Sequence, residues 1–167
     1  MSKLFDLQNK NVLLTGASKG MGLAMAQGLV NHGANVVISS RKLDQCQKAV
    51  DTINESVKQE KAFAFSCNAS SKDELNALVD FSISKLGSIT TLVCNAGVNS
   101  FFGSMSEIDD ESYDKTMNTN VKSNHWLINM VLPSMKESGG GSIMITSSIA
   151  AFHASDTLGT YLSLIHI

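Results

Sequence analysis

A glycine-rich turn near the N-terminus limits what this chain can fold into. Residues 15–22 read Thr-Gly-Ala-Ser-Lys-Gly-Met-Gly and lie between the apolar run 12–14 and the helix-period stretch 22–30. A strand, a tight glycine turn and a helix in this order open an α/β unit, and the N–H groups at the start of the helix can bind phosphate. Gly16 permits the sharp turn off the strand, and Gly20 lets a pyrophosphate approach the backbone.

The rest of the chain alternates short apolar runs with helix-period stretches. The runs predict strands at 12–14, 35–39, 62–65, 91–94 and 142–146. The stretches between them predict helices at 22–30, 43–57, 71–86 and about 109–135. Strands that alternate with helices imply a parallel sheet covered on both faces. We therefore predict one α/β domain over residues 1–161, with a doubly wound, Rossmann-like parallel sheet in a three-layer α/β/α arrangement.

Composition and charge argue against several other classes of protein. The formal net charge is −2, without a basic or acidic block, so nothing favours binding to nucleic acid or to a membrane surface. No apolar run approaches the roughly 18 residues of a membrane span, and residues 1–11 lack the apolar core of a signal peptide. Cys46, Cys67 and Cys94 lack metal-ligand spacing. We expect no metal site and free, mostly buried thiols in a reducing cytoplasm.

The glycine spacing G-x-x-x-G-x-G differs from the G-x-G-x-x-G of the common dinucleotide fold. It resembles the classical short-chain dehydrogenase/reductase family. Two further motifs extend this resemblance over residues 5–161: Asn-Ala-Gly at 95–97 and Ser148, which precedes Tyr161 by 13 residues. Segments such as 98–103 resemble the carbonyl reductase and alcohol dehydrogenase branch. The resemblance implies a dinucleotide cofactor, a small carbonyl or alcohol substrate, and a homodimeric or homotetrameric parent protein.

The end of the second predicted strand favours NADP(H) over NAD(H). Enzymes that select NAD usually place a carboxylate there, but residues 36–43 contain none. Arg41 and Lys19 can pair with a ribose 2′-phosphate, unless both are only solvated surface charges. Asn68 replaces an aspartate that relatives often turn toward the adenine, and its amide oxygen can still accept a hydrogen bond. The cofactor-binding residues that the resemblance implies are Gly16, Ser18, Lys19, Gly20, Met21, Gly22, Ser40, Arg41, Asn68, Asn95, Ala96 and Gly97.

The resemblance also implies a catalytic set. Tyr161 corresponds to the proton donor, and Ser148 to the hydroxyl that polarises the substrate carbonyl. Asn120 corresponds to the helix asparagine that holds a water in the proton relay, and Asn118 is a rival for this role. Each residue also has an ordinary structural interpretation: Ser148 could cap backbone at a strand end, and Tyr161 could be a loop aromatic.

The family carries a lysine four residues after its tyrosine, where this chain has Ile165. A tyrosine hydroxyl ordinarily ionises only near pH 10; the lysine favours ionisation and also holds the nicotinamide ribose. Ile165 can do neither, and His166 lies one helical position off the tyrosine's face. We expect an NADPH-dependent carbonyl/alcohol oxidoreductase as the parent and a nearly inactive chain here. The alternatives are a non-catalytic NADP(H)-binding module and, among enzymes, a 3-oxoacyl-carrier-protein reductase.

Residues 162–167 do not resemble the segment after the tyrosine in members of the family. The string CTGTCTCTTATACACATC, the end sequence of a transposon adaptor used in sequencing libraries, encodes these six residues, Leu-Ser-Leu-Ile-His-Ile. We expect them to be adaptor-derived and the natural gene to continue, with a frameshift or a truncated paralogue as the alternative. The continuation would add a helix, further strands and most substrate contacts, and any C-terminal targeting signal, such as a peroxisomal one. Without it, the fifth strand should be an exposed apolar edge.

Overall fold

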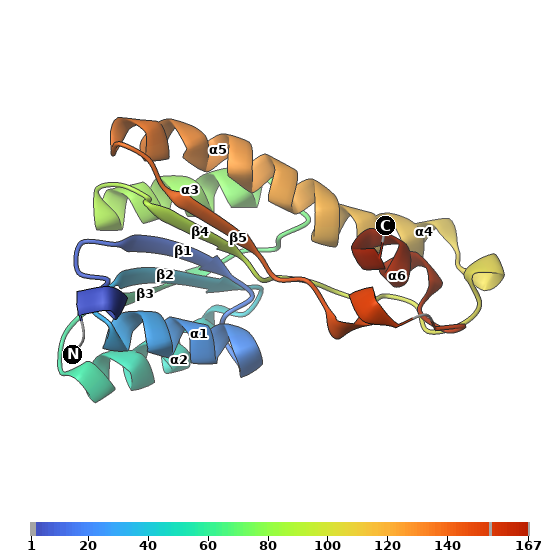
Figure 1. Ribbon diagram of the computed structural model, residues 1–167, viewed down its shortest axis with the longest axis horizontal. Helices are drawn as coiled ribbons and strands as arrows, with labels where there is room; N and C mark the ends of the chain where they lie inside the picture. Colours follow the sequence, from blue (N-terminus) through green and yellow to red (C-terminus); the bar gives the residue numbers. More distant parts are fainter. Residues whose placement is uncertain (1–2, 154, 167) are drawn as a thin grey trace.

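The computed structural model describes residues 3–153 and 155–166, with only the backbone of Lys3 and His166. Within these residues, five parallel strands form one sheet in the order β3-β2-β1-β4-β5. Helices cover both faces of the sheet (Figure 1), which confirms the predicted doubly wound α/β fold. The strands are β1 (Asn11–Thr15), β2 (Asn35–Ser40), β3 (Ala62–Ser66), β4 (Thr91–Cys94) and β5 (Ser142–Ile145).

Two separate cores hold the helices to the sheet. Helices α1 (Gly20–Asn31) and α2 (Leu43–Val57) pack on one face, and α3 (Lys72–Leu86) and α5 (Ser123–Glu137) pack on the other. Because successive side chains of a strand point to opposite faces, neighbouring residues enter different cores. Leu14 is buried with α1 and α2, whereas Leu13 is buried with α3 and α5.

Most predicted boundaries agree with the structure to within two residues. The ranges 43–57 and 91–94 match α2 and β4. The first helix begins at Gly20 rather than Gly22, and β5 ends at Ile145 rather than at residue 146. Helix α3 begins one residue late because Ser71 is its N-cap, and the Ser71 hydroxyl accepts a hydrogen bond from the Glu74 N–H.

The prediction of one uninterrupted helix over about 109–135 is wrong. The structure has α4 (Asp110–Met117), a π-helical segment η3 (Asn118–Lys122) and then α5. Side chains of η3 bond to distant parts of the chain: the Asn120 amide bonds to the backbone of Val98, and the Thr119 hydroxyl lies 2.7 Å from that of Ser70. These contacts favour the wider π turn, a feature that often occurs at functional sites.

Strand β5 is the outer strand of the described sheet, and its apolar side chains are exposed. Ile143, Met144 and Ile145 are 38%, 49% and 55% accessible. Consecutive side chains point to opposite faces, so neither helix layer reaches over this strand. The expectation of an exposed apolar edge is therefore confirmed for the described residues.

Three of the remaining short elements lie beyond the carboxyl ends of the strands. They are η2 (Met105–Glu107), η4 (Ile149–Phe152) and α6 (Gly159–His166). The fourth, η1 (Lys3–Phe5), lies at the opposite end of the sheet (Figure 1). In Figure 1, α4, η4 and α6 form a separate group beyond the sheet. Within the described residues, no helix combines the length and the apolarity needed to cross a bilayer.

Candidate cofactor and active site

The glycine turn joins β1 to α1 in a conformation that larger residues would not tolerate. Gly16 has φ +66°, and a Cβ there would lie 2.8 Å from the Ala96 Cα. A Cβ on Gly22 would collide with the Gly16 carbonyl oxygen. Gly20 has φ +58° with open space around its Cα, so it needs glycine for its backbone angle. The turn thus brings backbone close to the start of α1, as a phosphate-binding turn requires.

Asn95 fixes this turn from the end of β4. Its side-chain amide donates hydrogen bonds to the carbonyls of Thr15 (3.1 Å) and Gly16 (2.9 Å). In the other direction, the Thr15 hydroxyl accepts the N–H groups of Asn95 and Ala96, both at 3.1 Å. The Asn-Ala-Gly motif and the glycine turn therefore form one rigid unit, and a loss of either side should loosen the other.

A cavity of about 690 Å³ opens beside the glycine turn, and we call it the glycine-turn cavity. Three cations line it, Lys19, Arg41 and Lys42, and its described lining contains no carboxylate. Ser66 donates a hydrogen bond to the Arg41 carbonyl at 3.2 Å, which fixes the backbone that carries this cation. Of the predicted cofactor-binding residues, this cavity gathers Gly16, Ser18, Lys19, Ser40, Arg41, Asn68, Asn95, Ala96 and Gly97.

Asn68 lies in the glycine-turn cavity, but its amide oxygen already accepts a hydrogen bond from the Ser70 N–H at 3.1 Å. The Asn68 N–H in turn donates to the Glu74 carboxylate at 2.8 Å. A carbonyl oxygen has two lone pairs, so the predicted contact with an adenine can use only the second one. The hydrogen bonds also show a tight Asx-type turn that orients this residue.

A second cavity of about 460 Å³, the Tyr161 cavity, adjoins the first and shares Asn95, Ala96, Gly97 and Val98 with it. Tyr161 and Asn120 both line this cavity, as does Met21 from the start of α1. Tyr161 lies in helix α6, so the alternative that it is a loop aromatic is wrong. Ile165 and Leu164, from the same helix, also line the cavity, and its described lining contains no charged side chain.

Ser148 does not belong to the described lining of the Tyr161 cavity, where its neighbour Ser147 lies instead. The Ser148 hydroxyl accepts a hydrogen bond from the Ala150 N–H at 3.2 Å and caps the short helix η4. The structure thus brings Tyr161 and Asn120 together on one cavity, but it does not place Ser148 there. Its hydroxyl hydrogen remains available, since the cap uses only an acceptor lone pair.

Sequence reasoning missed several residues that line these cavities, among them Lys42, Gln45, Thr119 and Asn124. Lys42 follows Arg41 directly, so the charge pattern could have revealed it. Thr119 lies within the π turn and Asn124 follows it in α5, and this turn left no signal in the sequence. Asn124 donates to the Asn120 carbonyl at 2.8 Å.

The cysteines and the other titratable groups give no sign of a metal centre. All three cysteines are free and buried, as expected. Burial raises the pKa of the Cys67 thiol to about 12, with a smaller contribution from Glu74, and burial raises that of Cys94 to about 12 as well. Such thiols stay protonated and unreactive. Among the described residues, no group of three or more His, Cys, Asp or Glu could hold a metal ion.

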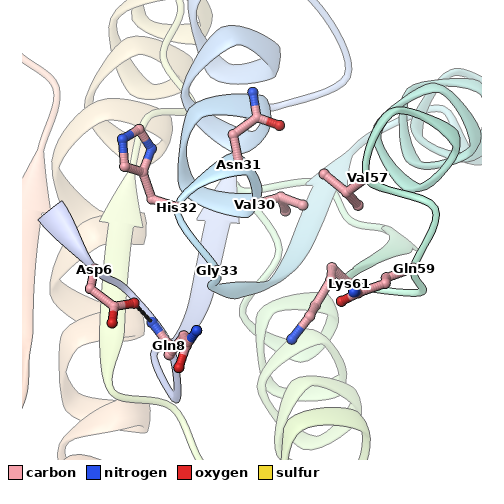
Figure 2. Close-up of a pocket in the computed structure, with 9 residues that line it drawn as sticks. All are labelled: Asp6, Gln8, Val30, Asn31, His32, Gly33, Val57, Gln59 and Lys61. Carbon is pink, nitrogen blue, oxygen red and sulfur yellow. Dashed lines mark hydrogen bonds between the residues drawn. The ribbon is translucent and has the colours of Figure 1, made fainter. Parts of the chain in front are cut away.

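A third cavity, of about 380 Å³, lies at the opposite end of the sheet, before the starts of β2 and β3. Figure 2 shows Asp6, Gln8, His32 and Lys61 around it, with the Gln8 N–H bonded to the Asp6 carboxylate at 2.9 Å. His32 bonds to the Gly28 carbonyl at 2.8 Å and caps the end of α1. The charged side chains that line this third cavity are not buried, and no predicted site residue lines it.

The family model for short chain dehydrogenases matches residues 10–163. The chain therefore belongs to the short-chain dehydrogenase/reductase family of oxidoreductases, and the resemblance inferred from its motifs is confirmed. A family of this kind accounts for the sheet topology, the glycine turn and the Asn-Ala-Gly motif together.

One similar protein is Dehydrogenase/reductase SDR family member 4 of Pongo abelii, 37% identical over 164 residues that cover 96% of this chain and 57% of the relative. A 7α-hydroxysteroid dehydrogenase structure, complexed with NADH and 7-oxo glycochenodeoxycholic acid, is 34% identical with a TM-score of 0.89, covering 95% of this chain and 61% of the other. A 3-ketoacyl-(acyl-carrier-protein) reductase of Brucella melitensis, complexed with NADH, is 26% identical with a TM-score of 0.89 (96% and 66% covered). The chain spans a little over half of the length of the curated relatives it matches.

Proposed function

We propose that this chain binds NADP(H) and that the protein it represents interconverts a carbonyl and a secondary alcohol. The observation that carries the cofactor assignment is the charge of the glycine-turn cavity, whose described lining includes Lys19, Arg41 and Lys42 and no carboxylate. Arg41 also borders a neighbouring cavity that Glu111 and Asp114 line. An NAD-selective site usually holds a carboxylate that accepts from the ribose 2′-OH and repels a 2′-phosphate. Three cations favour the opposite choice.

The residues present fit such a dinucleotide. Gly20 has open space beside it, with nothing within 4 Å of an added Cβ, so a pyrophosphate can approach the backbone of the glycine turn there. The first N–H groups of α1 and its macrodipole favour negative charge at this point. The Tyr161 cavity continues from there through the shared segment 95–98, so one extended ligand can reach both cavities.

When bound, the reduced nicotinamide supplies the hydride that a carbonyl carbon accepts. We assign the matching proton to the Tyr161 hydroxyl, which lines the cavity next to the glycine turn. The cap on Ala150 leaves the Ser148 hydroxyl hydrogen unused, but Ser148 is outside the described lining of the Tyr161 cavity, so its bond to the substrate oxygen is a role that only the family motif supports. Asn120 holds the segment after β4 through both atoms of its amide. The carbonyl thus gains one hydride and one proton, and Tyr161 is reprotonated from solvent.

Ile165 favours a second candidate function, a module that binds NADP(H) without turnover. It lies four residues after Tyr161 in the same helix and lines the same cavity. A side chain without charge cannot stabilise a tyrosinate, which general acid–base catalysis by this residue requires. We expect this chain to bind NADPH and to oxidise it negligibly across a panel of ketones.

The test is a pair of titrations with NADPH and NADH, on the native chain and on Arg41→Met. Loss of a charged contact to the 2′-phosphate should weaken NADPH binding about tenfold and leave NADH binding nearly unchanged. Lys61→Met is the matched control, because Lys61 lines the remote cavity shown in Figure 2. Equal affinity for the two cofactors in the native chain would contradict the NADP(H) assignment, and rapid NADPH oxidation would contradict the role given to Ile165.

A further inference from the structure

We infer that Ser70 and Thr119 are positioning residues for cofactor binding, and that they act through the contact between their hydroxyl groups. The two oxygens lie 2.7 Å apart and join segments that are 49 residues apart in the chain. Neither residue belongs to the glycine turn, to the Asn-Ala-Gly motif or to the catalytic set that the family motifs define. The inference rests on the proposed function, because it concerns the affinity for the same cofactor.

The contact joins two walls of the glycine-turn cavity. One wall is the turn before α3, where Asn68 and Ala69 line the cavity, and the other is the π turn, where Thr119 lines it. The Ser70 N–H donates to the Asn68 side-chain oxygen at 3.1 Å, so the position of Ser70 also determines that of Asn68. A ligand in this cavity would therefore lie between two segments that the Ser70–Thr119 contact holds together.

The Thr119 hydroxyl bonds to a distant segment, whereas the neighbouring hydroxyls bond within their own helix. Thr116 and Ser123 each donate to the carbonyl four residues earlier, at 2.9 and 2.6 Å, which is a common bond for a hydroxyl in a helix. Among the described residues, the Thr119 hydroxyl has Ser70 as its hydrogen-bond partner instead. The Thr119 side chain is only 7% exposed, so water has little access to replace that partner, and its loss costs free energy.

The π turn connects this contact to the Tyr161 cavity. Asn120 follows Thr119 directly, and its amide bonds to the N–H and the carbonyl of Val98, at 2.8 and 2.7 Å. Val98 lines both the glycine-turn cavity and the Tyr161 cavity. A displacement of the π turn would therefore change the walls of both cavities, which one extended cofactor would have to contact.

Preorganisation is the physical reason why the contact should affect binding. Without it, the turn before α3 and the π turn can separate in the free chain, and NADPH must order them again when it binds, which weakens binding. Helices α3 and α5 remain packed side by side (Figure 1). Near the other end of α5, the Ser134 hydroxyl accepts the Ile89 N–H at 3.0 Å. The fold should therefore persist while the affinity for NADPH falls.

A double-mutant cycle, measured by isothermal titration with NADPH, tests the inference. Ser70→Ala and Thr119→Val should each weaken NADPH binding about fivefold, and the double variant should lose no more than either single variant, since all three lack the same contact. Thr119→Ser keeps the hydroxyl and should bind NADPH within about twofold of the native chain. Ser134→Ala is the matched control: it removes another buried hydroxyl of α5, and it should lower the urea midpoint without changing the affinity for NADPH.

The inference is overturned if Ser70→Ala and Thr119→Val lower the urea midpoint but bind NADPH within about twofold of the native chain, because the contact is then only structural. Losses that multiply in the double variant also contradict it, since the two residues would then act separately. Ser70 is less buried than Thr119, so Ser70→Ala decides the question if Thr119→Val does not fold. All these results leave the proposed function intact, whereas a native chain that does not bind NADPH overturns the proposed function as well.

Discussion

Replacing Gly22 by alanine should destabilise the fold, whereas the same replacement at Gly28, in the same helix, should stabilise it. A Cβ on Gly22 would collide with the Gly16 carbonyl oxygen and lie 2.7 Å from the Asn95 amide nitrogen and 2.8 Å from the Ala17 Cα. Two of these three neighbours are backbone atoms, so the glycine turn itself must move. Around Gly28 no atom lies within 4 Å of the added Cβ.

The two magnitudes can be worked out from the contacts. At Gly22, overpacking costs about 1–3 kcal/mol. The two hydrogen bonds from Asn95 to the turn, at 3.1 and 2.9 Å, contribute about 0.5–1.5 kcal/mol each and would be strained or lost. The helix propensity of alanine offsets about 1 kcal/mol. We expect a net loss of about 3 kcal/mol for Gly22→Ala and a gain of about 1 kcal/mol for Gly28→Ala.

Urea unfolding of the two variants and the native chain, followed by far-ultraviolet circular dichroism, measures both values. The midpoints should move in opposite directions with an unchanged slope, because the surface exposed on unfolding is the same. If both variants shift the midpoint in the same direction, close packing is not the reason that residue 22 is a glycine. A loss below about 0.5 kcal/mol at Gly22 would lead to the same conclusion.

Three further outcomes are expected. Burial raises the pKa of Cys67 and Cys94 to about 12 from the ordinary value of 9.0, so the unfolded chain loses these protons first as the pH rises. The free energy of unfolding should therefore be highest below about pH 9 and fall as the pH rises toward 12. A Cys67→Ala, Cys94→Ala double variant should show a smaller fall. Ile145→Lys, on the exposed strand β5, should reduce self-association in light scattering. Asn54→Ala removes three hydrogen bonds to Lys61 and Ala62 and should cost about 2–3 kcal/mol in urea unfolding.

The sheet and its helices could be predicted because the signals that define them are local. Parallel strands buried on both faces appear as continuous apolar runs, and β1, β2 and β4 have that pattern. The glycine turn is local as well, since its conformation depends on glycines within one turn of chain. Helix caps were less visible: Ser71 was assigned to the helix that it caps.

The π turn could not be predicted because it depends on contacts between distant segments. The Thr119 hydroxyl meets Ser70, 49 residues earlier in the chain, and the Asn120 amide meets Val98, 22 residues earlier. The sequence around η3 has helical periodicity on both sides, so periodicity alone favours one helix. The case of Asn68 is different, because its amide oxygen accepts from a backbone N–H only two residues away, in a local turn.

Asn120 shows how far a match to a family motif can define a role. The motif predicts that Asn120 holds a water. In the structure the Asn120 amide oxygen accepts from the Val98 N–H at 2.8 Å, and the amide nitrogen donates to the Val98 carbonyl at 2.7 Å. Its backbone carbonyl receives the Asn124 amide at 2.8 Å. A water at this position must therefore use the second lone pair of one of these oxygens. The side chain fixes the loop after β4 against the π turn, and through that loop it determines where the Tyr161 cavity meets the glycine-turn cavity.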